Sequence, residues 1–243
     1  MSRRRSYRRG YPVAILAGLD EDRAVVWRVF SNVVKPDKTV WLGTDRNDAK
    51  AVYNFHESIV NTLRPVLKEG VRSIMLVAPP KTSYAQEFVK HVRQHHVWLT
   101  QGPNMAVFSQ TVGTASTLSE VALLARTPEF RRLISDTASE ESDNLVEMLE
   151  KHLQASNTSS AVLYSLREIE DSVLGQWKQG KPKPEYLLLT NKYLSNSSEK
   201  NRINRLVQVA KNKNVKTRIV DTDTAAGIRI TQLGGLVCFT RSD

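Results

Sequence analysis

Residues 184–243 constrain the fold of this chain most, because they alternate short apolar runs with stretches of helical character. Connections of this length suit crossovers better than hairpins, so the strands are expected to form a parallel or mixed sheet. We therefore predict an α/β layer of three strands with two helical connections. The predicted strands are 186–189, 215–220 and 235–239, and the predicted helices are 200–213 and 225–233.

The residues before this layer continue the alternation and indicate a second α/β domain, which a chain of 243 residues is long enough to hold. A long helix carries apolar residues from Val52 to Val66 at spacings of three and four, and Pro65 is expected to kink or restart its last turn. Thr117 and Thr137 each precede a glutamate at capping-box spacing, so each is expected to begin a helix. The predicted strands are 13–17, 24–30, 39–42, 73–77 and 105–108, and further helices are expected at 83–95, 117–126, 137–153 and 162–177.

A small, polar segment at residues 154–160 has the composition of a linker. It separates the two groups of predicted strands and helices. We therefore predict a basic tail at residues 1–10, a first domain at residues 11–155 and a second domain at residues 158–243.

The positive charge of the chain is unevenly distributed. The formal net charge is +10 at pH 7, and residues 1–10 carry five arginines and no acidic residue. Residues 158–243 carry 14 basic and 8 acidic residues, whereas the part between them is close to neutral. Charge concentrated in this way indicates a polyanionic partner, most simply RNA, and ordinary solubility charge is the alternative.

The chain has one cysteine, Cys238, and no long apolar run. One cysteine permits no intramolecular disulfide and no cysteine zinc site, which fits a reducing cytoplasm. No run approaches the roughly 18 apolar residues that a membrane span needs. The basic start imitates a secretory signal, but charged residues 20–23 stand where a cleavage site should be. We therefore expect a cytoplasmic protein without a membrane partner.

The most specific stretch of the sequence is residues 227–241. A glycine, a leucine-containing turn, a second glycine and an apolar strand that ends in arginine follow one another. This order resembles the end of Pelota, the ribosome-rescue relative of the archaeal and eukaryotic class-1 release factors. Ile228 stands where the family has a glutamate, so a contact through that carboxylate is not carried over. The matching residues are Gly227, Leu233, Gly235 and Arg241.

The resemblance extends, less sharply, over nearly the whole chain. Residues 55–79 look like the long helix and following strand of the family's central domain, and residues 162–190 look like the start of its C-terminal domain. The resemblance implies an α/β fold of two domains. One is release-factor-like with a mixed sheet and a long helix, and the other is an α/β layer like that of the kink-turn-binding ribosomal proteins. We expect no counterpart of the family's N-terminal decoding domain in these residues.

The loop before the long helix is where a class-1 release factor carries Gly-Gly-Gln, which places a backbone donor and a water at the peptidyl-tRNA ester. Here the loop reads Gly43, Thr44, Asp45 and Arg46, and the only Gly-Gly pair of the chain is followed by leucine. We therefore expect no peptidyl-tRNA hydrolysis. The role expected of the loop is an N-terminal helix cap from Thr44 or Asp45. An enzyme that acts on tRNA through this loop is the alternative.

Other catalytic and metal-binding signals are weaker. His91 and His95 have the i, i+4 spacing of metal ligands on a helix, and His96 is adjacent. No acidic residue lies beside them and Arg93 lies between them, so a solvated helix end is favoured over a metal site. Glycine-rich phosphate loops and a nucleophile elbow are absent from the sequence. The sequence therefore predicts a protein that has no metal, no cofactor and no enzymatic activity.

Two groups of basic residues are candidates for RNA contact. Arginines interleaved with tyrosine in the tail can pair with phosphates and stack on bases. In the predicted helix 200–213, apolar residues supply the buried face, so the basic side chains are expected to point outward, and a solvated face is the alternative. The candidates are Arg3, Arg4, Arg5, Tyr7, Arg8 and Arg9 in the tail, and Lys200, Arg202, Arg205, Lys211 and Lys213 in the helix.

These observations lead to the hypothesis of a ribosome-binding factor of the Pelota type, expected to be a monomer and to act in ribosome rescue, recycling or hibernation. Its tail would bind ribosomal RNA. The resemblance implies that its C-terminal domain contacts a translational GTPase or an ABC-type recycling ATPase. The alternative is a stand-alone protein that binds structured RNA through the basic helix.

Overall fold

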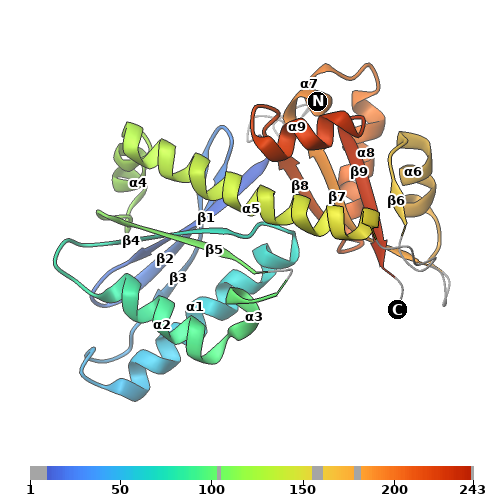
Figure 1. Ribbon diagram of the computed structural model, residues 1–243. Coiled ribbons are helices and arrows are strands. Elements are labelled where there is room, and N and C mark those ends of the chain that lie inside the picture. The colour runs from blue at the N-terminus through green and yellow to red at the C-terminus, as the bar shows by residue number, and fades with distance from the viewer. Residues whose placement is uncertain (1–9, 103–104, 155–160, 178–181, 242–243) are drawn as a thin grey trace, which may run out of the picture. The chain divides into compact units, whose positions relative to one another are not determined.

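The computed structural model describes residues 10–102, 105–154, 161–177 and 182–241, and the chain forms two compact units (Figure 1). The first unit contains Met1–Leu67 and Val71–Glu141, and the second contains Lys68–Gly70 and Ser142–Asp243. The division falls inside a helix, whereas the predicted domain boundary lies at residues 155–158. Of the predicted tail, residues 1–9 lie outside the described part of the chain.

The first unit is built on a mixed five-stranded sheet in the order β3-β2-β1-β4-β5. The pairs β1–β2 and β2–β3 are antiparallel, and the pairs β1–β4 and β4–β5 are parallel. The strands are β1 (Pro12–Leu19), β2 (Arg23–Phe30), β3 (Val34–Trp41), β4 (Ser73–Ala78) and β5 (Val107–Val112). The helices are α1 (Ala49–Lys68), α2 (Tyr84–His95), α3 (Val97–Thr100), α4 (Leu118–Leu124) and α5 (Pro128–Gln154), the last of which ends in the second unit.

Both faces of this sheet are covered by helices (Figure 1). Because successive side chains of a strand point to opposite faces, Ile15 of β1 packs in the core under α1 and α2, and Leu16 packs in the core under α4 and the start of α5. The first core contains Phe55 and Phe88, and the second contains Phe130. The continuous apolar run of β4 is therefore buried on both sides, as the sequence predicts.

The second unit has a mixed four-stranded sheet in the order β6-β9-β7-β8. The pair β7–β8 is parallel, and the pairs β7–β9 and β6–β9 are antiparallel. The strands are β6 (Val162–Leu163), β7 (Lys183–Thr190), β8 (Lys216–Val220) and β9 (Leu236–Arg241). The helices are α6 (Leu166–Leu174), α7 (Asn191–Asn196), α8 (Lys200–Asn212) and α9 (Ala225–Gln232).

Helices also cover both faces of the second sheet. Helix α9 and the C-terminal part of α5 pack against Tyr186 and Phe239. The two rings stack with their centroids 4.9 Å apart. On the other face, α6 and α8 pack against Leu187 and Cys238. The predicted α/β fold, with two helix-covered sheets, is confirmed. The compact units divide inside α5 because Leu145 and its neighbours in that helix belong to the core of the second sheet.

Several local predictions are corrected by the structure. The capping box of Thr117 is present and begins α4, but Thr137 lies in the middle of α5, where its hydroxyl donates to Leu133 O at 2.7 Å. Helix α5 instead begins at Pro128, a residue suited to the first helical position. The predicted helix 162–177 is shorter because Val162–Leu163 pairs with β9. Helix α1 runs through Pro65 to Lys68.

No helix in the described part of the chain combines the length and the apolar character needed to cross a membrane.

Candidate functional site

The loop before α1, residues 43–48, is held in place by Arg46. Its Nε donates to Glu21 O at 2.8 Å, and a second N–H of the guanidinium donates to Asp20 O. The guanidinium carbon lies 3.7 Å from the centre of the Tyr84 ring, and 14% of the side chain is exposed. Burial lowers the pKa of Arg46. Arg46 therefore stabilises the turn between β1 and β2.

The predicted helix cap in this loop is wrong. Asp48, not Thr44 or Asp45, caps α1: its Oδ1 accepts from the backbone N–H groups two and three residues further on, at 2.9 and 3.2 Å. Asp45 accepts instead from the backbone and side chain of Asn47, and these hydrogen bonds lower the pKa of Asp45. Because α1 begins at Ala49, Thr44 and Asp45 lie too far ahead of the first helical N–H groups to cap them. Gly43 has no neighbouring atom within 4 Å of an added Cβ, so nothing requires a glycine there.

The basic residues of α8 do not form one uniform positive face. Lys200 and Arg205 are exposed, and neither has a salt bridge to another described residue. Arg202 is also exposed but pairs with Glu170 at 2.5 Å and with Glu199. Those hydrogen bonds raise the pKa of Arg202, so its guanidinium stays charged. The two carboxylates offset that positive charge. The unpaired positive charge of this helix is therefore concentrated at Lys200 and Arg205.

The prediction that all five basic side chains of this helix point outward is wrong for its end. Lys213 is half-buried: its Nζ donates to Gly175 O at 2.7 Å and lies 5.0 Å from the centre of the Trp177 ring. It thereby satisfies a carbonyl at the C-terminus of α6. Lys211 is also half-buried. The tail candidates Arg3, Arg4, Arg5, Tyr7, Arg8 and Arg9 lie outside the described residues, so their role stays a prediction.

Residues of the C-terminal motif shape the turns around α9. Gly227 lies so close to Asp221 that an added Cβ would be 1.9 Å from Asp221 O. Gly235 has φ +82°, in the left-handed region that favours glycine, and its N–H donates to Ile230 O at 2.9 Å. Leu233 packs against the core on the α9 side of the sheet. The two glycines and the leucine of the motif therefore have structural reasons for their identity.

The remaining positions of the motif lie at its ends. Arg241 is the last residue of β9 and pairs with Lys183 of β7 in the sheet register. Ile228, which stands at the family's glutamate position, is 52% exposed. Isoleucine therefore presents an apolar side chain to solvent at this position of α9.

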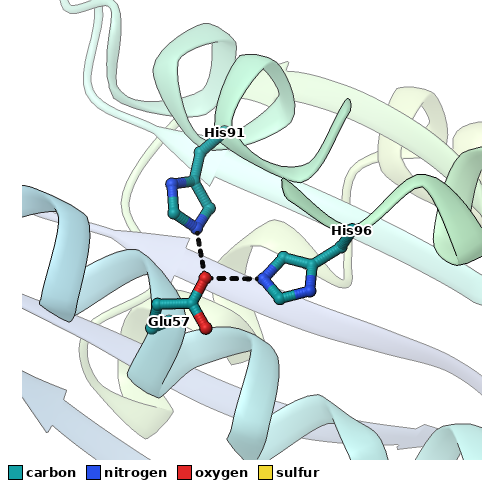
Figure 2. Close-up of side chains that lie close together, drawn as sticks. All are labelled: Glu57, His91 and His96. Atoms are coloured by element: carbon teal, nitrogen blue, oxygen red, sulfur yellow. Dashed lines mark hydrogen bonds and ion pairs between the residues drawn. The ribbon is translucent and has the colours of Figure 1, made fainter. Parts of the chain in front are cut away.

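A cluster that the sequence did not predict joins α1 to the end of α2. Glu57 of α1 lies between His91 of α2 and His96, the residue between α2 and α3 (Figure 2). Both imidazoles contact the same oxygen: Glu57 Oε1 is 3.0 Å from His91 Nε2 and 2.7 Å from His96 Nε2. Both histidines are 6% exposed. The arrangement brings two imidazoles and one carboxylate together at a nearly buried place.

Electrostatics in this cluster favour a neutral His91 imidazole beside an ionised Glu57 carboxylate. Burial lowers the pKa of His91, although its hydrogen bond to Glu57 opposes that shift. Burial lowers the pKa of the adjacent His56 to about 4, with smaller contributions from His91 and Arg46. Burial raises the pKa of Glu57, but the hydrogen bonds from His96 and His91 outweigh it, and that pKa lies below its usual value.

The two histidines with metal-ligand spacing in the sequence, His91 and His95, are not the pair that converges on Glu57. Their ring centroids are 4.9 Å apart, but His95 is exposed and His91 points to Glu57. The missing partner, Glu57, is far away in the sequence, so spacing within one helix could not reveal it. One local signal existed: His91 falls on the buried stripe of α2 with Phe88 and Val92, which contradicts a solvated helix end.

Comparison with solved structures identifies the fold. The chain superimposes on archaeal Pelota, described in its ribosome-bound form with ABCE1, with a TM-score of 0.52 and 16% sequence identity. It superimposes on Dom34 of S. cerevisiae with a TM-score of 0.51 and 17% identity. The chain has the Pelota fold.

The similarity to Pelota covers nearly all of this chain but not all of the relatives. It includes 94% and 98% of this chain, and 61% and 66% of the archaeal and yeast chains, so this chain spans less than two thirds of their length. No protein-family model and no curated protein matches the sequence. The similarity therefore confirms the predicted resemblance to Pelota at the level of the fold.

Proposed function

We propose that this protein is a ribosome-associated factor that acts in ribosome rescue, recycling or hibernation. The observation that carries the proposal is the Pelota fold over both units, because the archaeal relative is ribosome-bound and the yeast relative is a translation termination-like factor in RNA quality control. The basic tail and the exposed Lys200 and Arg205 fit an RNA partner. The protein would work in the cytoplasm, where translating ribosomes are found.

The proposed factor does not hydrolyse peptidyl-tRNA. The loop at residues 43–48 has no Gly-Gly-Gln, and its arginine is engaged with backbone carbonyls in the first unit. The Gly-Gly pair of the sequence, Gly234 and Gly235, belongs to the turn between α9 and β9. Binding to ribosomal RNA, rather than covalent chemistry, is therefore the proposed activity.

The proposed protein partners follow from the two relatives. Archaeal Pelota is described together with ABCE1, and Dom34 interacts with Hbs1. We propose that this chain, as a monomer, contacts an ABC-type recycling ATPase or a translational GTPase. Because Ile228 is exposed on α9, a partner contact at that position would be apolar rather than ionic.

Co-sedimentation with cognate ribosomes and separated subunits across a salt series tests the proposal. We expect binding that weakens steeply as salt rises, because arginine side chains that bind phosphates release counterions. A chain that starts at Tyr11 should bind more weakly, and its log–log salt slope should flatten by about 0.7 for each phosphate that it no longer binds. The double substitution Lys200→Ala with Arg205→Ala should flatten the slope further.

The control for these substitutions is Lys50→Ala with Lys90→Ala, which removes the same charge from exposed positions of the first unit. This control should sediment with ribosomes like the unchanged chain. Absence of ribosome binding at every salt concentration would contradict the proposal. Crosslinking that recovers one small structured RNA as the main product would instead support a stand-alone RNA-binding protein.

A further inference from the structure

We propose that Glu57, His91 and His96 form a binding site for a divalent transition-metal ion, with zinc as the ion best matched to these ligands. The site would connect α1 to the junction of α2 and α3 in the first unit (Figure 2). The inference is independent of the proposed function, since nothing in ribosome association requires a metal at this position.

The ligand set fits zinc chemistry. Imidazole nitrogen and carboxylate oxygen are common zinc ligands, and three protein ligands with one open position occur in many zinc sites. The three donor atoms lie within 4.8 Å of one another. Ligands at zinc distances of about 2.0–2.2 Å in a tetrahedron are roughly 3.3 Å apart, so the side chains need only small adjustments to surround an ion.

The hydrogen bonds of the cluster show how an ion would replace protons. With no metal, each Nε2–H donates to Glu57 Oε1, so both imidazoles aim the nitrogen that would bind the ion at the same carboxylate oxygen. With a metal, each neutral ring carries its proton on Nδ1, and the two Nε2 lone pairs and the carboxylate bind the cation.

The surroundings allow a cation at this place. Glu57 supplies a negative charge, and its side chain is 28% exposed. The partial exposure of Glu57 gives an ion a route from solvent.

Titration of the untagged 243-residue chain with Co²⁺ tests the site, because Co²⁺ in a tetrahedral site absorbs visible light and Zn²⁺ displaces it without absorbing. We expect saturation at one Co²⁺ per chain and loss of the absorption when Zn²⁺ is added. Glu57→Gln should weaken Co²⁺ binding by at least about tenfold, because it removes the charged ligand and keeps its size. The tail and the single buried Cys238 do not compete for the ion, since residues 1–9 carry no His, Cys, Asp or Glu.

His95→Ala is the matched control. It removes the exposed histidine that has i, i+4 spacing to His91, and it should leave Co²⁺ affinity unchanged. An equal loss of affinity in His95→Ala and in Glu57→Gln would place the ion at the exposed end of α2 and overturn the proposed ligand set. An absence of saturable Co²⁺ absorption in the unchanged protein would overturn the site altogether.

A second measurement uses only the unchanged protein, so it does not require that any variant folds. Long-range ¹H–¹⁵N spectra of the unchanged protein report the tautomer of each histidine. Zn²⁺ should move two of the five histidines to the Nδ1–H tautomer with a shifted Nε2 resonance and leave the others unchanged. The same two signals should stay at their metal-free positions in Mg²⁺, which prefers oxygen ligands. Signals that do not respond to Zn²⁺ would contradict the proposal.

Discussion

Replacing Gly227 with alanine is expected to destabilise the second unit by about 3 kcal/mol, because the added methyl group overlaps backbone atoms. Its position would lie 1.9 Å from Asp221 O and 2.7 Å from Thr222 Cα. The turn cannot easily move away. Asp221 O accepts from the hydroxyl of Thr224 at 2.7 Å, and the Asp221 side chain accepts from Asn191 at 3.1 Å. The loss of stability in this unit can be measured by urea denaturation and by hydrogen exchange of the β7 and β9 amides.

Gly43→Ala is the control for the effect of removing a glycine. An added Cβ at Gly43 meets no atom within 4 Å, so its effect on the free energy of unfolding should stay within about 0.5 kcal/mol. A loss for Gly227→Ala as small as that of Gly43→Ala would show that α9 does not lie against the Asp221 turn. The glycine of the motif would then need an explanation outside the fold, such as contact with a partner.

Glu141→Ala is expected to destabilise the first unit by about 3 kcal/mol, because it removes the acceptor of one buried backbone N–H and the nearest acceptor of a buried hydroxyl. Glu141 is 1% exposed. Its Oε1 accepts from Arg72 N at 3.0 Å, and its Oε2 accepts from the hydroxyl of Ser73. These hydrogen bonds join the start of β4 to α5. The expected result is a lower urea midpoint for the first unit, with faster hydrogen exchange of the β4 amides.

Two further variants sharpen this test. Glu140→Ala removes the neighbouring, exposed carboxylate of the same helix and should change stability by less than about 0.5 kcal/mol. Glu141→Gln keeps one acceptor oxygen and should lose less stability than Glu141→Ala. If Glu140→Ala and Glu141→Ala destabilise the protein equally, helix propensity rather than the buried hydrogen bonds would explain the loss.

Signals within a few residues predicted much of the fold correctly. The apolar stripe of α1 and the capping box at Thr117 depend on interactions within one or two helical turns, and the structure contains both. The same local spacing predicted, wrongly, that a helix begins at Thr137. Its hydroxyl returns to the carbonyl four residues back, as is common inside a helix, while Pro128 provides the start of α5.

The candidate site depended on residues that are distant in the sequence. The charge of Arg202 is neutralised by Glu170 of another helix, and the Lys213 amine is taken up by the end of α6. The sequence shows basic residues on α8 but not the partners that other elements bring to them. Likewise, His91 and His96 obtain their carboxylate from α1, which only the packing of the helices reveals.

The buried thiol of Cys238 is a chemical probe for opening of the second unit. Cys238 lies in β9 between Leu163 of β6 and Leu187 of β7, and burial raises its pKa to about 12. Alkylating reagents react with thiolate, so they can modify this residue only when the sheet separates. Because the chain has no other cysteine, the labelling rate measures the population of the opened second unit directly, both in free solution and on a ribosome.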